Sequence, residues 1–247
     1  MTNIISFEEN FLSPESCSKL LESLGHLDEL VHKEKHLDRL VPRSKRIQFT
    51  SNAVTSTGIP THAPINRDWF IQSSKVNDFH GTRKRVYTNF EPDFRKCQVF
   101  KRVLDHHHKV FNIPEDTVTL SILQKSFYTP ENLKNCPTGQ GIHSDGVQFQ
   151  TIVVLEKENL IGPENSFYLP RLDDSSVIKE ELCRKELEIG DLVHFHDNLC
   201  YHSVSRSKLK DKSQNGSRTV LILSSPAHYH FTGESNPNNL LVASPKF

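Results

Sequence analysis

From residue 117 to about residue 225, short runs rich in β-branched and aromatic residues alternate with turn-forming segments. Runs this short, broken this often by Gly, Pro, Asn and Asp, are typical of strands in an antiparallel barrel or sandwich. The predicted strands are TVTLSILQKSFY, GIHSDGVQFQTIVVL, NSFYLP, LEIGDLVHFHD, CYHSVS and RTVLILSS. The pattern therefore predicts a β core over about residues 116–230.

The chain up to about residue 115 has a different residue pattern, which predicts a mainly helical or irregular layer. Ser13 is a suitable helix N-cap and Pro14 suits the first helical position, ahead of SCSKLLESL. A second helix is predicted over FRKCQVFKRVLDHHHKVF, whereas the polar stretch SNAVTSTGIPTHAP (51–64) predicts an irregular loop. Since no composition break resembles a linker, we expect residues 1–247 to form a single domain.

Composition narrows the possible partners. The chain has 30 Lys and Arg against 30 Asp and Glu, so no global basic excess favours a nucleic acid or an anionic membrane surface. No apolar run is long enough for a transmembrane helix, and the start has no signal-peptide pattern. The five cysteines are scattered without a CxxC pair, which favours a reducing compartment. We expect a cytoplasmic protein without a nucleic-acid or membrane partner.

The chain has 14 histidines, three of them consecutive at His106, His107 and His108. Consecutive residues on a helix point in different directions, so three neighbours do not meet at one point. The pattern predicts a solvated surface run at these positions, not a metal site.

Residues 141–146 read GIHSDG and place His143 and Asp145 two positions apart. Residues i and i+2 of a strand point to the same face, so a strand starting here would project both side chains together. The same face would continue through Phe149 and Thr151. An imidazole and a carboxylate on one face are two thirds of the facial triad that binds non-haem iron.

The third ligand predicted is His202, in CYHSVS, with His194 and His196 as rivals. Only His202 is followed at a suitable range by a cation entering a strand, Arg218 in GSRTVLIL. A guanidinium there could bind a carboxylate through two parallel hydrogen bonds. Arg206 is the competing cation, but it opens a polar loop.

Several motifs resemble the iron(II)- and 2-oxoglutarate-dependent dioxygenases. More narrowly, they resemble the bacterial family that includes L-isoleucine dioxygenase and related hydroxylases of free aliphatic amino acids. The resemblance covers about residues 65–225 and is carried by WFIQSSKVN (69–77), GIHSDGVQF (141–149), GPENSFY (162–168), GDLVHFHDNLCYHSV (190–204) and SRTVLIL (217–223). The family often has Gly-Gly-Glu-Ser where this chain has Gly162-Pro163-Glu164-Asn165.

The resemblance implies an α+β fold with a double-stranded β-helix (jelly-roll, cupin-like) core and flanking N-terminal helices. It implies His143, Asp145 and His202 as the ligands of Fe(II), with O2 and 2-oxoglutarate as co-substrates. Arg218 would hold the distal carboxylate of 2-oxoglutarate, and Gln124 would touch the same molecule.

The resemblance also implies hydroxylation of a small molecule, foremost a free aliphatic L-amino acid such as Leu, Ile or Met, with release of succinate and CO2. The candidate substrate contacts are Gln72, Arg83, Arg85, Phe149 and Glu164, with Trp69, Phe70 and Tyr87 as further apolar wall. Two alternatives stay open. One is the same chemistry on a peptide or protein side chain or on a secondary-metabolite intermediate, and the other is a cupin-like binding protein without turnover.

Overall fold

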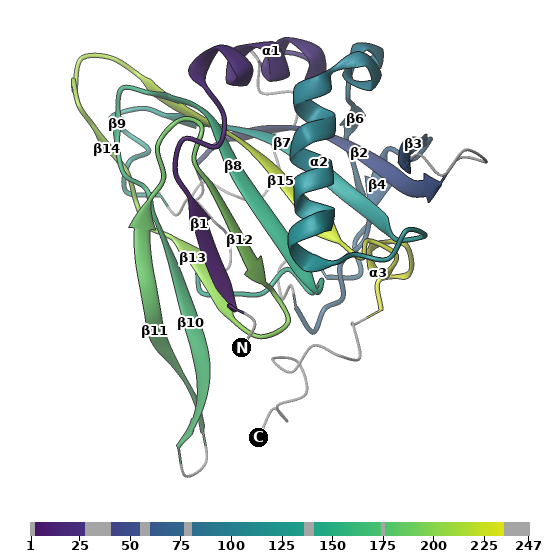
Figure 1. The fold of residues 1–247 in the computed structure, drawn as a ribbon. Helices are drawn as coiled ribbons and strands as arrows, with labels where there is room; N and C mark the ends of the chain where they lie inside the picture. The colour runs from purple at the N-terminus through teal and green to yellow at the C-terminus, as the bar shows by residue number, and fades with distance from the viewer. Residues whose placement is uncertain are drawn as a thin grey trace.

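The computed structural model describes residues 3–27, 41–54, 60–76, 81–135, 141–173 and 176–234, and its centre is a large, mainly antiparallel sheet (Figure 1). Its strand order is β1-β12-β8-β15-β7-β2-β3, with β6 pairing in parallel to β2. The bounds are β1 Ile5–Glu8, β12 Leu192–His196, β8 Phe149–Glu158, β15 Gly216–Ser225, β7 Val118–Tyr128, β2 Arg43–Val54, β3 Pro60–Ile65 and β6 Thr88–Asn89.

A second, three-stranded sheet has the order β11-β10-β13 and packs against one face of the large sheet. Phe167 of β10 contacts Phe7 of β1 and Phe195 of β12, with ring centroids 5.9 and 5.0 Å apart. The bounds are β10 Glu164–Asp173, β11 Ser176–Glu186 and β13 Tyr201–Val204, and two short pairs are β9 Leu160–Ile161 with β14 Lys208–Leu209, and β4 Trp69–Phe70 with β5 Arg85–Val86. Two facing antiparallel sheets form the double-stranded β-helix core, so the predicted fold class is confirmed.

The helices are α1 (Pro14–Leu24), η1 (Pro92–Lys96), α2 (Gln98–Phe111) and α3 (Tyr229–Thr232), and α1 and α2 cover the outer face of the large sheet (Figure 1). Ser13 caps α1 as predicted. Its Oγ accepts a hydrogen bond of 3.2 Å from the Ser16 amide. Leu20 and Leu24 are fully buried. No described helix is long and apolar enough to span a membrane.

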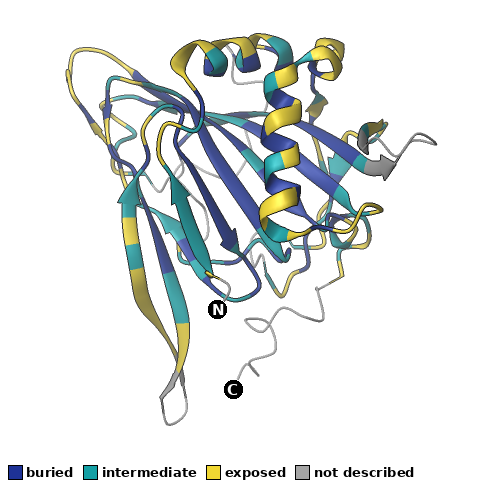
Figure 2. Cartoon of the chain, viewed as in Figure 1, coloured by how far each residue is buried: buried dark blue, intermediate teal, exposed yellow. Residues whose placement is uncertain are grey.

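The large sheet buries both of its faces, as the dark central strands of Figure 2 show. Successive residues of β15 illustrate the division. Leu221 and Leu223 join the core under α1 and α2, whereas Val220 and Ile222 join the core between the two sheets. We call these the helix face and the inner face of the sheet.

An irregular loop was predicted over residues 51–64, but strands occupy 51–54 and 60–64, and residues 55–59 lie outside the described part of the chain. β2 pairs with β7 from Arg43 opposite Ser126 to Ser51 opposite Val118, and β3 pairs with the end of β2. β2 has only a weak alternation of apolar and polar residues, because it contains several lysines and arginines. Ile47 and Phe49 are its fully buried apolar residues. Prolines are tolerated in β3 because it is an edge strand of the sheet formed by the described residues.

The prediction of a solvated run at 106–108 is wrong for two of its three histidines. His107 is 0% and His108 is 8% exposed, and both point from α2 onto the helix face of the sheet. His107 Nδ1 lies 2.6 Å from Thr151 Oγ1, and His108 Nε2 lies 2.8 Å from Thr119 Oγ1. Hydroxyl groups on the sheet thus contact imidazoles that the sequence pattern assigned to solvent.

Candidate active site

The GIHSDG motif lies in the segment that precedes β8, not in a strand. β8 begins only at Phe149, and His143 forms an isolated antiparallel bridge with His202. The His143 amide donates to the His202 carbonyl at 2.9 Å, and the His202 amide donates to the His143 carbonyl at 2.8 Å. These two backbone hydrogen bonds bring together two histidines that lie far apart in the sequence.

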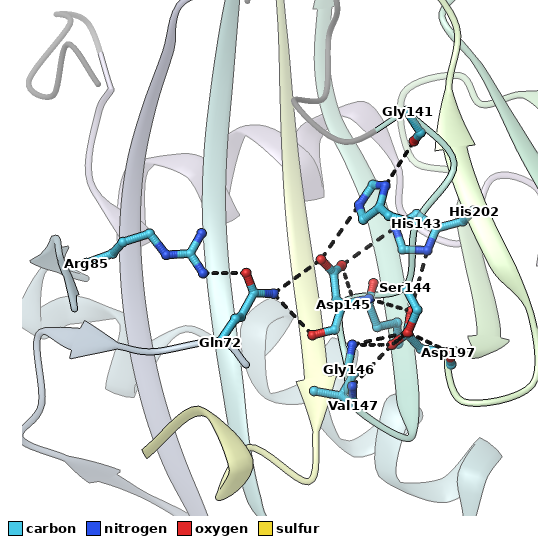
Figure 3. Close-up of polar contacts among 11 residues, drawn as sticks. Gln72, Arg85, Gly141, His143, Ser144, Asp145, Gly146, Val147, Asp197 and His202 are labelled. Carbon is cyan, nitrogen blue, oxygen red and sulfur yellow. Dashed lines mark hydrogen bonds and ion pairs between the residues drawn. The ribbon is translucent and has the colours of Figure 1, made fainter. Parts of the chain in front are cut away.

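His143, Asp145 and His202 converge on one point (Figure 3). His143 Nε2 lies 3.7 Å from Asp145 Oδ1, and His202 Nε2 lies 3.6 Å from Asp145 Oδ2. The potential ligand atoms all lie within 4.8 Å of one another. Since metal–ligand bonds to imidazole and carboxylate are about 2 Å long, one ion between these atoms could contact all three.

A buried carboxylate, Asp197, holds this loop in place from behind (Figure 3). Asp197 follows β12 and is 0% exposed. Its oxygens accept hydrogen bonds from Asp145 N (3.0 Å), Gly146 N (2.9 Å), Val147 N (3.1 Å) and Ser144 Oγ (2.9 Å). Because these amides bind a carboxylate, they are not available to a strand partner, which explains why no strand begins here. Asp197 Oδ1 also lies 3.5 Å from His202 Nδ1.

Strand parity therefore does not run from Asp145 into β8. Gly146 turns the chain with a φ of +85°, and a Cβ there would come within 2.9 Å of the Val76 side chain. Glycine adopts this left-handed conformation without strain. As a result Gln150, not Phe149, faces the site, and Gln150 Nε2 donates to Asp145 Oδ2 at 2.6 Å. Sequence reasoning missed both Asp197 and Gln150, although a carboxylate directly after a buried strand is a signal for a buried acceptor.

The electrostatics of the triad suit a cation. Burial alone would raise the pKa of Asp145, but His143, His202 and the Gln150 amide outweigh it and hold that pKa well below its usual range. Burial lowers the pKa of His143, which keeps its imidazole neutral and able to bind a metal. Burial also acts on His202, but Asp197 and Asp145 raise its pKa overall.

A guanidinium lies on the other side of Asp145, beyond a buried glutamine (Figure 3). Gln72 Nε2 donates to the Asp145 carbonyl at 3.1 Å and lies 3.5 Å from Asp145 Oδ1. Arg85 Nη2 donates to Gln72 Oε1, and the Arg85 guanidinium lies 4.3 Å above the Phe70 ring. The structure thus brings Gln72 and Arg85 next to the triad.

Arg218 lies in β15 and is only 8% exposed. Its Nε and Nη2 atoms have no hydrogen-bond partner among the described residues. Val220 of the same strand faces inward and lies opposite Gln124 of β7, so Arg218 and Gln124 share the inner face. The rival Arg206 is exposed, outside any strand.

The remaining sequence candidates lie elsewhere. Phe149 stacks on Phe111 of α2 with ring centroids 4.6 Å apart, on the helix face. Glu164 forms an exposed ion pair of 3.5 Å with Arg184, and Arg83 is exposed. The rival metal ligands also lie on the helix face, where His194 Nδ1 contacts Thr151 Oγ1 at 2.6 Å and His196 packs against Phe149.

Comparison with known families connects this geometry to an activity. The model of the 2OG-Fe dioxygenase family matches residues 28–224, most of the chain. The chain belongs to this family. The enzyme is therefore a dioxygenase that uses Fe(II), 2-oxoglutarate and O2. No curated protein sequence matches the chain significantly.

Solved structures share the fold of this dioxygenase at low sequence identity. IDO from Bacillus thuringiensis is 14% identical with a TM-score of 0.61, covering 90% of this chain and 89% of that chain. A bsmA homolog from Methylobium petroleophilum PM1 is 15% identical with a TM-score of 0.64, covering 87% and 82%. The Fe(II)/α-ketoglutarate-dependent dioxygenase TqaL is 12% identical with a TM-score of 0.62, covering 90% and 82%.

The inner face of the dioxygenase fits its cofactors. Two imidazoles and a carboxylate that meet within 4.8 Å match the donor set of non-haem iron(II). A buried guanidinium with unpaired donors is unfavourable unless an anion reaches it, and the distal carboxylate of 2-oxoglutarate is such an anion. Burial lowers the pKa of Arg218, but an arginine stays charged at neutral pH.

Asp197→Asn is expected to lower the free energy of unfolding by about 2–4 kcal/mol, because an amide cannot accept the hydrogen bonds of both carboxylate oxygens. Iron affinity should fall by about 10–100-fold, as expected when a residue that orients metal ligands is changed. Urea denaturation and iron titration measure the two effects. Asp116→Asn, at an exposed turn position, is the control and should change neither. Unchanged iron affinity in Asp197→Asn would show that Asp197 does not position the triad.

Proposed function

We propose that this dioxygenase hydroxylates a C–H bond of a free aliphatic L-amino acid such as Leu, Ile or Met. In this proposal His143, Asp145 and His202 hold the iron, Arg218 binds the distal carboxylate of 2-oxoglutarate with Gln124 beside it, and residues 1–247 act as one domain. The observation that carries the substrate class is Arg85, a second guanidinium on the far side of Asp145 from His202. A free amino acid brings a carboxylate that this cation can pair with.

Iron(II) with 2-oxoglutarate supplies the chemistry that uses dioxygen to hydroxylate a C–H bond, with release of succinate and CO2. The protein supplies position. Gln72 and Gln150 donate to Asp145 from two sides and fix the plane of its carboxylate. Arg218 sets the orientation of 2-oxoglutarate through its distal end, and Arg85 sets that of the amino acid. Phe70, packed under the Arg85 guanidinium, supports that side chain from the core.

The motifs at 69–77 and 141–149, which resemble the L-isoleucine dioxygenase family, contain Gln72 and the triad residues His143 and Asp145. The fold likeness to IDO is consistent with this relationship. The departure at 162–165 falls in a part of the chain where Glu164 pairs with Arg184. Glu164 is therefore not assigned to the substrate. Arg83, which is exposed, and Phe149, which lies on the helix face, are not assigned to it either. A panel of aliphatic amino acids measures the substrate specificity.

The proposal is tested by supplying the iron-loaded enzyme with each L-amino acid, with and without 2-oxoglutarate, and measuring succinate and a mass gain of about one oxygen in the amino acid. We expect at least one aliphatic L-amino acid to be hydroxylated only when 2-oxoglutarate is present. The same assay should include peptides that contain the same residues and N-acylated amino acids. Turnover of a peptide but of no free amino acid would overturn the substrate class and leave the iron chemistry intact.

Arg85→Gln should raise the KM for the amino acid by about 30–150-fold, since a charge-assisted hydrogen bond contributes about 2–3 kcal/mol. The KM for 2-oxoglutarate should change little, which separates this role from that of Arg218. Arg83→Gln changes an exposed neighbour and is the matched control. Equal effects of the two substitutions on the amino-acid KM would remove Arg85 from the substrate site.

Arg218→Ala should raise the KM for 2-oxoglutarate by about 100-fold, because a bidentate ion pair in a buried position is lost. Steady-state succinate release at varied 2-oxoglutarate measures the effect. Arg206→Ala is the control, since Arg206 is exposed and was the rival in the sequence. A large KM increase in Arg206→Ala with none in Arg218→Ala would reverse the assignment.

A further inference from the structure

A second group of metal-ligating side chains lies on the helix face of the large sheet. It consists of Glu8 in β1, His106 in α2 and His194 in β12, and we call it the Glu8 cluster. Glu8 Oε1 lies 2.7 Å from His106 Nε2 and 3.4 Å from His194 Nε2. The potential ligand atoms all lie within 4.8 Å of one another, as they do in the His143 triad.

The Glu8 cluster and the triad lie on opposite faces of the same sheet. His194 lies opposite Thr151 of β8, whereas Phe195 lies opposite Gln150. Gln150 donates to Asp145 on the inner face, and Phe195 packs against His202 with ring centroids 5.1 Å apart. Because neighbouring residues of a strand point to opposite faces, His194 and Thr151 face α2. The two groups therefore cannot share an ion.

His194 carries an unsatisfied nitrogen aimed into the cluster. The side chain is 1% exposed, and its Nε2 has no well-aligned hydrogen bond among the described residues, with Glu8 Oε1 3.4 Å away. A buried polar atom of this kind normally has a partner. An imidazole whose hydrogen is on Nδ1 offers the electron pair of Nε2 to a cation.

A chain of hydrogen bonds is compatible with the tautomer that metal binding needs. His194 Nδ1 lies 2.6 Å from Thr151 Oγ1, which lies 2.6 Å from His107 Nδ1. His107 Nε2 in turn lies 3.0 Å from Ser225 Oγ. When His194 donates from Nδ1 to Thr151, the Thr151 hydroxyl donates to His107, and His107 donates to Ser225. In this polarity His194 Nε2 carries the lone pair, and an outer hydrogen bond orients the ring as in known metal sites.

The other two members of the cluster are positioned but reachable from solvent. The side chains of His106 and Glu8 are 25% and 38% exposed. Phe11 stacks on the His106 ring with centroids 4.7 Å apart, which restricts the ring's orientation. Solvent access gives an entry path for an ion and leaves room for water as a fourth ligand.

We propose that Glu8, His106 and His194 form a second metal site, which binds zinc or a similar divalent transition-metal ion with water as the fourth ligand. Two imidazoles and one carboxylate favour zinc over magnesium or calcium, which prefer oxygen ligands. The three residues come from β1, α2 and β12, so a bound ion ties the N-terminal strand and the long helix to the sheet. The site is structural and contacts no substrate.

Zinc also binds to iron sites, so the test uses a His143→Ala background in which the triad is incomplete. Metal-stripped His143→Ala protein is titrated with zinc by calorimetry, and we expect one site per chain. Adding His106→Ala or Glu8→Gln should weaken that site by at least about 10-fold, whereas adding His26→Ala, at an exposed position, should not. The metal-stripped protein without substitutions should bind two zinc ions.

Thermal unfolding gives a second readout. Zinc at about 100-fold above its dissociation constant should raise the melting temperature of His143→Ala protein by about 5 °C and should not raise that of the His143→Ala, His106→Ala double variant. Glu8→Gln, at a half-exposed position, serves if the His106 change prevents folding. Absence of zinc binding to His143→Ala protein, or binding that neither Glu8→Gln nor His106→Ala weakens, would overturn the site. Neither result bears on the proposed hydroxylase activity.

Discussion

Asp145→Ala and His143→Ala are each expected to lower kcat by at least about 1,000-fold, because the triad then keeps only two ligands and cannot hold iron in a working geometry. The fold should persist. The loop is held by the two backbone hydrogen bonds between His143 and His202 and by main-chain donors to Asp197, none of which needs the removed side chains.

Succinate release under saturating 2-oxoglutarate measures kcat, and the bound iron per chain is measured on the same samples. Circular dichroism and the melting temperature report on the fold. His26→Ala is the matched control, because it removes an exposed imidazole far from the triad in sequence. If either triad variant kept more than about one tenth of the activity with a full complement of iron, the residue would not be a ligand.

Mild acid is expected to unfold the protein, because α2 buries two neutral histidines against the sheet. Burial lowers the pKa of His107 well below its usual value, and lowers the pKa of His108 to about 4. The unfolded chain takes up a proton at each position near pH 6.5, whereas the folded chain resists until the pH is far lower. Stability is therefore fully present above pH 6.5 and is lost as the pH falls toward 4.

At pH 5 each of these histidines should lower the free energy of unfolding by about 2 kcal/mol, a large part of the stability of an ordinary domain. Urea denaturation of metal-stripped protein between pH 8 and 4.5 measures the effect. The glutamine in His108→Gln cannot take up a proton. As the pH falls, the free energy of unfolding of this variant should therefore decrease less steeply than that of the unsubstituted chain, by the contribution of one proton. The same pH dependence in both proteins would show that His108 does not titrate on unfolding.

The sequence predicted the β core well where its strands alternate strongly or are apolar throughout. β7, β8 and β15 have clear apolar and β-branched patterns, and β15 divides its side chains between the two faces as the period of two requires. β2 was missed because its charged residues outweigh Ile47 and Phe49 in the local pattern, and its partner β7 lies far from it along the chain. Pairing over such a distance leaves no local signal.

The candidate site shows a similar division. The spacing in GIHSDG and the later His202 and Arg218 are visible in the sequence, whereas the groups that orient them are not. Asp197 acts on main-chain amides of residues 145–147, and no side-chain pattern reveals that contact. His107 and His108 look like surface residues until Thr151 and Thr119 are seen beside them.

The hydrogen bonds from backbone N–H groups to Asp197 have an evolutionary consequence. Since Asp197 holds the loop through backbone amides, a change of the side chain at position 145 leaves these hydrogen bonds in place. A descendant of this chain could thus acquire a new reactivity at its metal through one codon change, with the scaffold already in place to receive it.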